Sequence, residues 1–144
     1  MGMKISINMR QFKQEMAAEL ELLQKATRPA AQAGAQIVYE RAKQLAPVSD
    51  APHMFQIEGR KYGPFAPGTL RDSIYQAFSK DNSYKDVSVY HVSWNATKAP
   101  YGAMVEVGTS RAPAKSFIAR AVTETRAQVR DAIKRRYVEE VTKA

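Results

Sequence analysis

The spacing of apolar residues changes at about residue 10. Before that point four apolar residues alternate strictly with polar ones, namely Met3, Ile5, Ile7 and Met9. Alternation with a period of two is typical of a half-buried β-strand. Beyond it, apolar residues fall three or four positions apart among good helix formers, at Phe12, Met16, Leu20 and Leu23. The pattern therefore predicts a strand over residues 3–9, followed by a long helical region.

The helical region contains Pro29 and ends before Pro47. Because proline is tolerated in the first turn of a helix, residues 27–29 either begin a second helix or kink a continuous one. Residues 48–67 then form a stretch rich in proline and glycine. We expect an irregular loop here, inserted into the fold, and long loops in compact domains are usually functional or mobile.

Two segments of high β propensity follow, residues 73–78 and 86–95, with turn-forming residues between them. They predict a β-hairpin. In the second segment the apolar positions change phase between Val89 and Tyr90, which favours a β-bulge over a strand covered on both faces.

A second long helix is expected from residue 117, with Ser116 as its N-cap. Its apolar positions form one stripe, and basic residues occupy much of the rest. The whole pattern predicts one α+β domain over residues 1–144. In it, a small antiparallel sheet, made of the N-terminal strand and the hairpin, packs against the two long helical regions.

Charge adds one candidate function. The chain has 22 basic and 14 acidic residues, a formal net charge of +8, and most of the excess lies in the two helical regions. Basic residues that could form a DNA-binding surface on the last helix are Arg126, Arg130, Lys134 and Arg135. Acidic residues interrupt them, so the same pattern also fits an ordinary solvated helix face. No apolar run is long enough to cross a membrane.

Candidate catalytic chemistry is sparse. The chain has no cysteine, which excludes disulfides and thiolate metal sites, and no clustered ligands predict a metal or cofactor. His53 and His91 could serve as acid and base of a small basic nuclease, but only if they converge on one pocket. The stronger explanation is that His53 is an exposed loop histidine and that His91 makes one hydrogen bond within its strand. We therefore expect no enzymatic activity.

The stretch 101–109, YGAMVEVGT, places Glu106 between two valines. It fits two helical turns that end at Gly108. Glu106 is expected to hold the turn together, beside the amides of residues 108–110 or near Arg71 or Arg111. The alternative is that Glu106 reaches a neighbouring subunit.

Three segments, in order, make the chain resemble the bacteriophage neck or tail-completion family of long-tailed phages and prophages. They are AKQLAPV at residues 42–48, GTLRDSI at 68–74 and YGAMVEVGT at 101–109, the last followed by Pro113, Phe117 and Ala121. The resemblance covers about residues 30–125. The chain departs from the family in the extra residues within 48–67, and in Ser116 where a proline often precedes the phenylalanine.

The resemblance implies a non-enzymatic virion protein at the head-tail junction, present in the host cytoplasm during assembly. It implies self-association, with a ring as our hypothesis, and contact with adjacent connector and tail proteins and with packaged DNA. The matching positions would be structural or interfacial rather than catalytic: Leu70, Arg71, Tyr101, Glu106, Gly108, Thr109 and Phe117. The proline-rich loop and the last helix are the expected contact surfaces. A basic nucleic-acid-binding protein is the alternative function.

Overall fold

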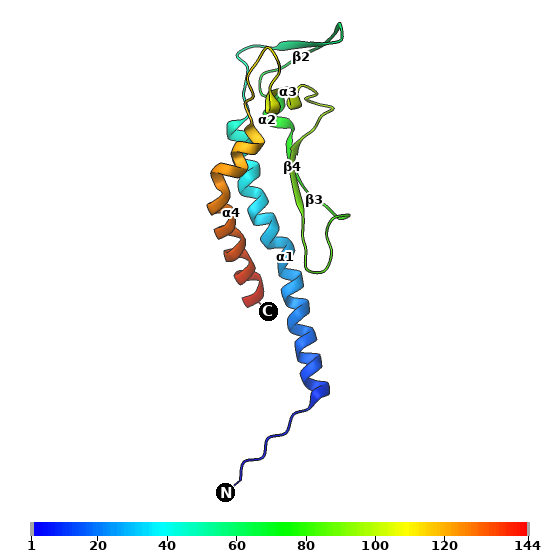
Figure 1. Ribbon diagram of the computed structural model, residues 1–144, viewed down its shortest axis with the longest axis vertical. Coiled ribbons are helices and arrows are strands. Elements are labelled where there is room, and N and C mark those ends of the chain that lie inside the picture. The colour runs from blue at the N-terminus through cyan, green and yellow to red at the C-terminus, as the bar shows by residue number, and fades with distance from the viewer. Residues whose placement is uncertain (1, 144) are drawn as a thin grey trace.

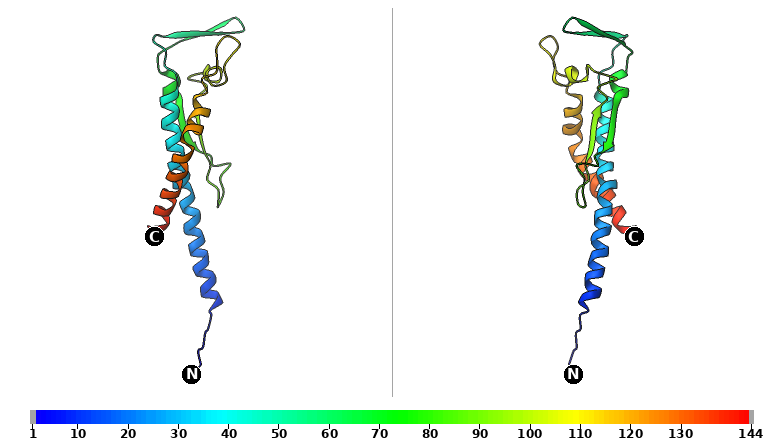
Figure 2. Two further views of the ribbon diagram at one scale, coloured as in Figure 1. Left: turned by 60° about the vertical axis from the view of Figure 1, so that its left-hand side comes forward. Right: turned by 90° about the vertical axis from the view of Figure 1, so that its right-hand side faces the viewer.

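One long helix, α1 (Met9–Leu45), forms the axis of the molecule in the computed structural model, which describes residues 2–143 (Figure 1). A second helix, α4 (Phe117–Thr142), runs back along the upper part of α1. The remaining elements lie beside this pair or at its upper end (Figures 1 and 2). The α+β class with two long helices is confirmed.

α1 is continuous through Pro29, which decides between the two alternatives for that region. Proline has no N–H to donate and so removes one bond of the helix ladder. The helix nevertheless persists there, because Ala26 and Ala30 on either side are buried. Packing of an apolar face contributes more to helix stability than local propensity does.

The predicted strand over residues 3–9 is wrong. Residues 2–8 form no regular secondary structure, and Met3, Ile5 and Ile7 are 71–87% exposed. Alternation alone makes no strand, because each strand needs a partner for its backbone and cover for its apolar face. In the structure, α1 begins at Met9. The Asn8 side chain caps it by accepting hydrogen bonds from the amides of Arg10 and Gln11.

The expected hairpin is confirmed as β3 (Ile74–Phe78) and β4 (Tyr90–Trp94), paired antiparallel from Ile74↔Trp94 to Phe78↔Tyr90. This register contains no bulge, which corrects the bulge prediction. The apolar phase changes because β4 begins only at Tyr90. Val87 and Val89 belong to the connecting segment, where Val87 bridges Tyr84.

The expectation of an irregular loop at 48–67 is also wrong. It contains a second hairpin, β1 (His53–Ile57) and β2 (Arg60–Phe65), which forms a separate two-stranded sheet. The two residues of its turn, Glu58 and Gly59, both have positive φ, as a tight hairpin turn of the primed type requires. The two sheets therefore replace the single sheet that the sequence predicted.

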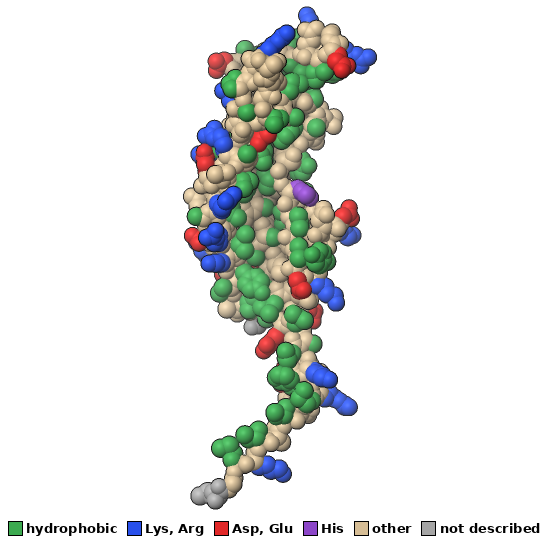
Figure 3. Space-filling model, viewed as in Figure 1, with side chains coloured by type: hydrophobic (Ala, Val, Ile, Leu, Met, Phe, Trp, Pro, Cys, Tyr) green, Lys and Arg blue, Asp and Glu red, His purple; other side chains and the backbone are tan. Residues whose placement is uncertain are grey.

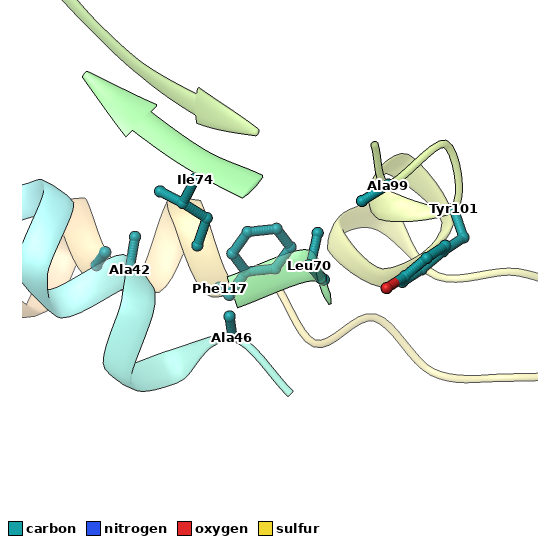
Figure 4. Close-up of a cluster of buried hydrophobic side chains, with 8 residues drawn as sticks. Ala42, Ala46, Leu70, Ile74, Ala99, Tyr101 and Phe117 are labelled. Carbon is teal, nitrogen blue, oxygen red and sulfur yellow. The ribbon is translucent and has the colours of Figure 1, made fainter. Parts of the chain in front are cut away.

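The core lies at the upper end of the molecule, where both helices meet the short helices α2 (Thr69–Ser73) and α3 (Gly102–Val107) (Figure 4). Its buried side chains come from four regions far apart in the sequence: Ala42 and Ala46, Leu70 and Ile74, Ala99 and Tyr101, and Phe117 and Ala121. Phe117 and Leu70 are the largest fully buried side chains.

Small residues on α1 allow α4 to approach closely below this core. Ala26, Ala30 and Gly34 are buried on α1, each four residues from the next. A Cβ added at Gly34 would lie 2.9 Å from side-chain atoms of Ile133 in α4. Small side chains on this face of α1 thus let the two helix axes come close together.

Candidate functional site

Glu106 lies between the end of α3 and the start of α4. Its carboxylate accepts two backbone hydrogen bonds, from the Ile118 amide at 2.9 Å and from the Ala119 amide at 3.0 Å. The first amides of a helix have no partner within the helix, and the helix dipole favours a negative charge beside them. Glu106 therefore caps α4 from twelve residues away.

Ser116 occupies the N-cap position of α4, but its side chain makes no capping bond. Its backbone has a positive φ of 45°, and its hydroxyl instead donates to the Glu106 carbonyl at 3.1 Å. The sequence prediction that Ser116 caps the helix is thus corrected. The capping group is a carboxylate supplied by another helix.

The last carbonyls of α3 are satisfied by the chain that enters α4. The Lys115 amide donates to the Val105 carbonyl at 2.8 Å, and the Ser116 amide donates to the Glu106 carbonyl at 3.1 Å. The carbonyls at the end of α3 and the amides at the start of α4, which lack partners within their own helices, therefore find hydrogen bonds in the same region. We call residues 105–119 the α3–α4 joint.

Gly108 and Thr109 shape the turn inside this joint. Gly108 has a φ of 81°, and a Cβ there would lie 2.6 Å from the Ala114 amide nitrogen, so a side chain is excluded. The Thr109 hydroxyl accepts hydrogen bonds from the amides of Arg111 and Ala112. The expected partners of Glu106 are thus corrected, because its carboxylate binds the Ile118 and Ala119 amides of α4 rather than the amides of residues 108–110 or an arginine.

A pocket of about 420 Å³ opens beside the joint. Its walls are mostly apolar and come from the end of α1, from β1, from α2 and from α3, with Val48, Phe55, Leu70 and Met104 among them. Polar side chains in the lining include Ser49, His53, Thr109 and Lys115. The sequence prediction missed this pocket because residues 48–67 were expected to be irregular. The aromatic residues within that stretch were the available signal.

Tyr101 links the pocket to the core. Its ring lies edge-on to His53 at 4.6 Å between centroids and packs against Phe65 at 5.0 Å and Phe55 at 5.7 Å. Burial raises the pKa of the Tyr101 hydroxyl above its ordinary value, and a hydrogen bond with the Leu70 backbone partly offsets this rise. Tyr101 is thus a neutral packing residue that joins the β1–β2 hairpin to α3.

The other motif residues have different surroundings. Leu70 and Phe117 are core side chains. Arg71 is partly exposed and pairs with its neighbour Asp72, with 3.0 Å between Nε and Oδ1, rather than with Glu106. This pairing raises the pKa of Arg71 and lowers that of Asp72, through the hydrogen bond first.

The predicted basic residues Arg126, Arg130, Lys134 and Arg135 are all exposed on α4. The first three lie four residues apart and so share one face of the helix. Within residues 2–143, none of the four takes part in an ion pair. Lys and Arg side chains gather along the outer edge of α4 in Figure 3.

The two histidines do not form a common site. His53 lies in β1 against the pocket, whereas His91 is exposed on β4, in the other sheet. Across residues 2–143, no group of three potential metal ligands comes together. In that same range no helix combines the length and the apolar character that a membrane span needs.

Comparison of the chain with protein-family models, with curated proteins and with solved structures found no match.

Proposed function

We propose that this protein is a non-enzymatic component of a bacteriophage particle that acts at the head-tail junction, as a neck or tail-completion protein. In this role it associates with itself, in a ring by our hypothesis, and binds adjacent head-tail joining and tail proteins. It works in the host cytoplasm during assembly and is then part of the virion.

The observation that carries the proposal is the amount of surface that the single chain exposes. Its accessible area is 10559 Å², whereas a compact monomer of this mass exposes about 7,400 Å². An elongated chain with so much free surface suits a part of a larger assembly better than an independent enzyme.

The positions of the motif residues support the same proposal. The three segments that carry the resemblance to the neck or tail-completion family, 42–48, 68–74 and 101–109, meet in one core through Ala46, Leu70 and Tyr101. Glu106, the carboxylate of the third segment, is engaged in capping α4. The motif is therefore accounted for by structure, without a catalytic role.

The test is deletion of the gene from an intact phage or prophage. We expect filled heads and separate tails in electron micrographs, with infective particles restored by the wild-type gene on a plasmid. Mass spectrometry of purified particles should then detect the protein. Normal infective particles without the gene would exclude a role in joining head and tail.

DNA binding is a second candidate, favoured by the row Arg126, Arg130 and Lys134, for which the described residues provide no ion pair. Binding through phosphate contacts should weaken steeply as salt is raised, and changing all three residues to alanine should reduce the salt slope by about 3. Fluorescence anisotropy with a DNA duplex measures both. No binding even at low salt contradicts this candidate.

A further inference from the structure

The first four turns of α1 extend beyond the end of α4 and are covered by no other element (Figures 1 and 2). Five apolar side chains form one row along this part, and we call them the N-terminal stripe: Met9, Phe12, Met16, Leu20 and Leu23. They are 39–55% exposed. Their spacing of three, four, four and three residues places all five on one narrow face of the helix.

This face continues the face of α1 that α4 covers higher up. The same spacing leads from Leu23 to Ala26, Ala30 and Gly34, which are buried. Gly34 lies against Val129 and Ile133, so the end of α4 at Thr142 comes near the level of Leu23. The stripe is therefore the uncovered continuation of an established helix–helix interface.

The extended arm, residues 2–8, adds three more exposed apolar side chains at the same end. Together the arm and the stripe hold eight of the eighteen large apolar side chains that are exposed in the described chain, so the exposure is concentrated there. If each buries roughly 100 Å², they supply about 800 Å², the share of one partner in a standard specific interface.

The charges around the stripe favour a second copy of this chain as the occupant. Along residues 9–25, Arg10, Lys13 and Lys25 are balanced by three glutamates, Glu15, Glu19 and Glu21. Helices that bind a membrane surface or a nucleic acid carry an excess of basic residues, which this segment lacks. With Lys4 of the arm the surface has a net charge of only +1, so two copies meet with little repulsion, unlike two copies of the basic face of α4.

We infer that the N-terminal stripe, with the arm, is the self-association surface of this protein and packs against the stripe of a second copy. This inference rests on the self-association in the proposed function. A helix from the second copy packs on the N-terminal stripe, which α4 leaves uncovered. This contact extends the α1–α4 interface along α1.

Single cysteines test this contact directly, because the natural chain has none. Met16 is the centre of the stripe, so it meets its own counterpart whether two helices pair in parallel or antiparallel. Gln14 lies on the opposite side of the same turn and is the matched control. After mild oxidation, Met16→Cys should form covalent dimers and Gln14→Cys should not.

A charge on the stripe tests its contribution to affinity. Leu20→Glu would place a carboxylate in the contact and should raise the dissociation constant at least about tenfold, since a buried unpaired charge is costly. Gln14→Glu adds the same charge on the far side and should change nothing. Sedimentation velocity measures association, and circular dichroism verifies that both variants fold.

The outcomes separate the inference from the proposed function. The inference about the stripe is overturned if Leu20→Glu leaves the oligomer intact, or if Met16→Cys and Gln14→Cys cross-link equally. Neither result contradicts the proposed function. The inference is also overturned if the wild-type chain stays monomeric at high concentration. In that case gene deletion decides the role in the particle independently.

Discussion

At the scale of the residue, Glu106 determines how two helices are joined. Both of its carboxylate oxygens accept hydrogen bonds from backbone amides of α4. Its backbone carbonyl accepts hydrogen bonds from the amide and the hydroxyl of Ser116. A serine in this left-handed conformation does not cap the helix with its own side chain. The charge among the valines thus substitutes for a local N-cap.

Replacement of Glu106 by alanine should lower the free energy of unfolding by about 1–2 kcal/mol, the usual cost of losing an N-cap. Glu106→Gln should lose less, because the amide oxygen still accepts a hydrogen bond. Urea unfolding measures the change, with Glu15→Ala on exposed α1 as the control. If Glu106→Ala keeps full stability but abolishes self-association, the side chain acts at an interface rather than in the joint.

Gly102 allows α3 to approach the hairpin. A Cβ at this position would overlap the indole ring of Trp94 in β4. Gly102→Ala should therefore destabilise the fold by about 1–3 kcal/mol, because a well-packed site must shift to admit the methyl group. Gly2→Ala, where no atom lies within 4 Å, is the control in thermal unfolding. Equal melting temperatures would mean that Trp94 moves aside freely.

At the scale of the element, α1 and α4 are linked by one ion pair besides their apolar contact. Glu124 on α4 accepts two hydrogen bonds from Arg41 on α1, at 2.8 Å and 2.6 Å, and one from Arg120 at 3.2 Å. These contacts, with the Arg41 hydrogen bond first, lower the pKa of Glu124 below its ordinary value. The pair is half-exposed, so its effect on stability is modest.

The sign of the pH dependence follows from this lowered pKa. Glu124 contributes stability above the pKa that it has in the unfolded chain, and the contribution is lost as the pH falls through its lower pKa in the folded chain. The melting temperature of Glu124→Gln should therefore fall less between neutral and acidic pH than that of the wild type. Asp131→Asn, on the same helix but without an ion pair, should follow the wild-type curve.

At the scale of the whole molecule, the chain is long and its core is confined to one end. Buried side chains concentrate where α2, α3 and the ends of both long helices meet, whereas the N-terminal turns of α1 are exposed on every side. Short helices without tertiary contacts are marginal in water, so we predict that the stability of these turns depends on cover from another molecule.

Amide hydrogen exchange at two protein concentrations should detect this dependence. Residues 9–23 should exchange more slowly at high concentration, because association protects the unsupported turns, while residues 34–45 should be unaffected. In Leu20→Glu the concentration dependence should disappear. Equal protection of residues 9–23 at all concentrations would show that the helix needs no partner.

The sequence alone determined the two long helices, the β3–β4 hairpin and the α+β class. Local features specify these elements: a sustained apolar period of three to four residues, and two β-rich segments joined by turn residues. It also indicated that Glu106 is held by partners within its own fold, because a carboxylate among apolar residues needs hydrogen-bond donors. The resemblance to phage proteins rested on short motifs, and the function that it suggests stays a proposal.

Only the tertiary structure decided what the apolar patterns pack against. Residues 3–9 alternate like a strand but find no partner strand, whereas residues 53–65 form a hairpin despite their proline and glycine. The amides that Glu106 binds lie twelve and thirteen residues along the chain, beyond the reach of any local pattern. The physical reason is that spacing reveals which face of an element is apolar, while burial depends on which distant segment arrives to cover it.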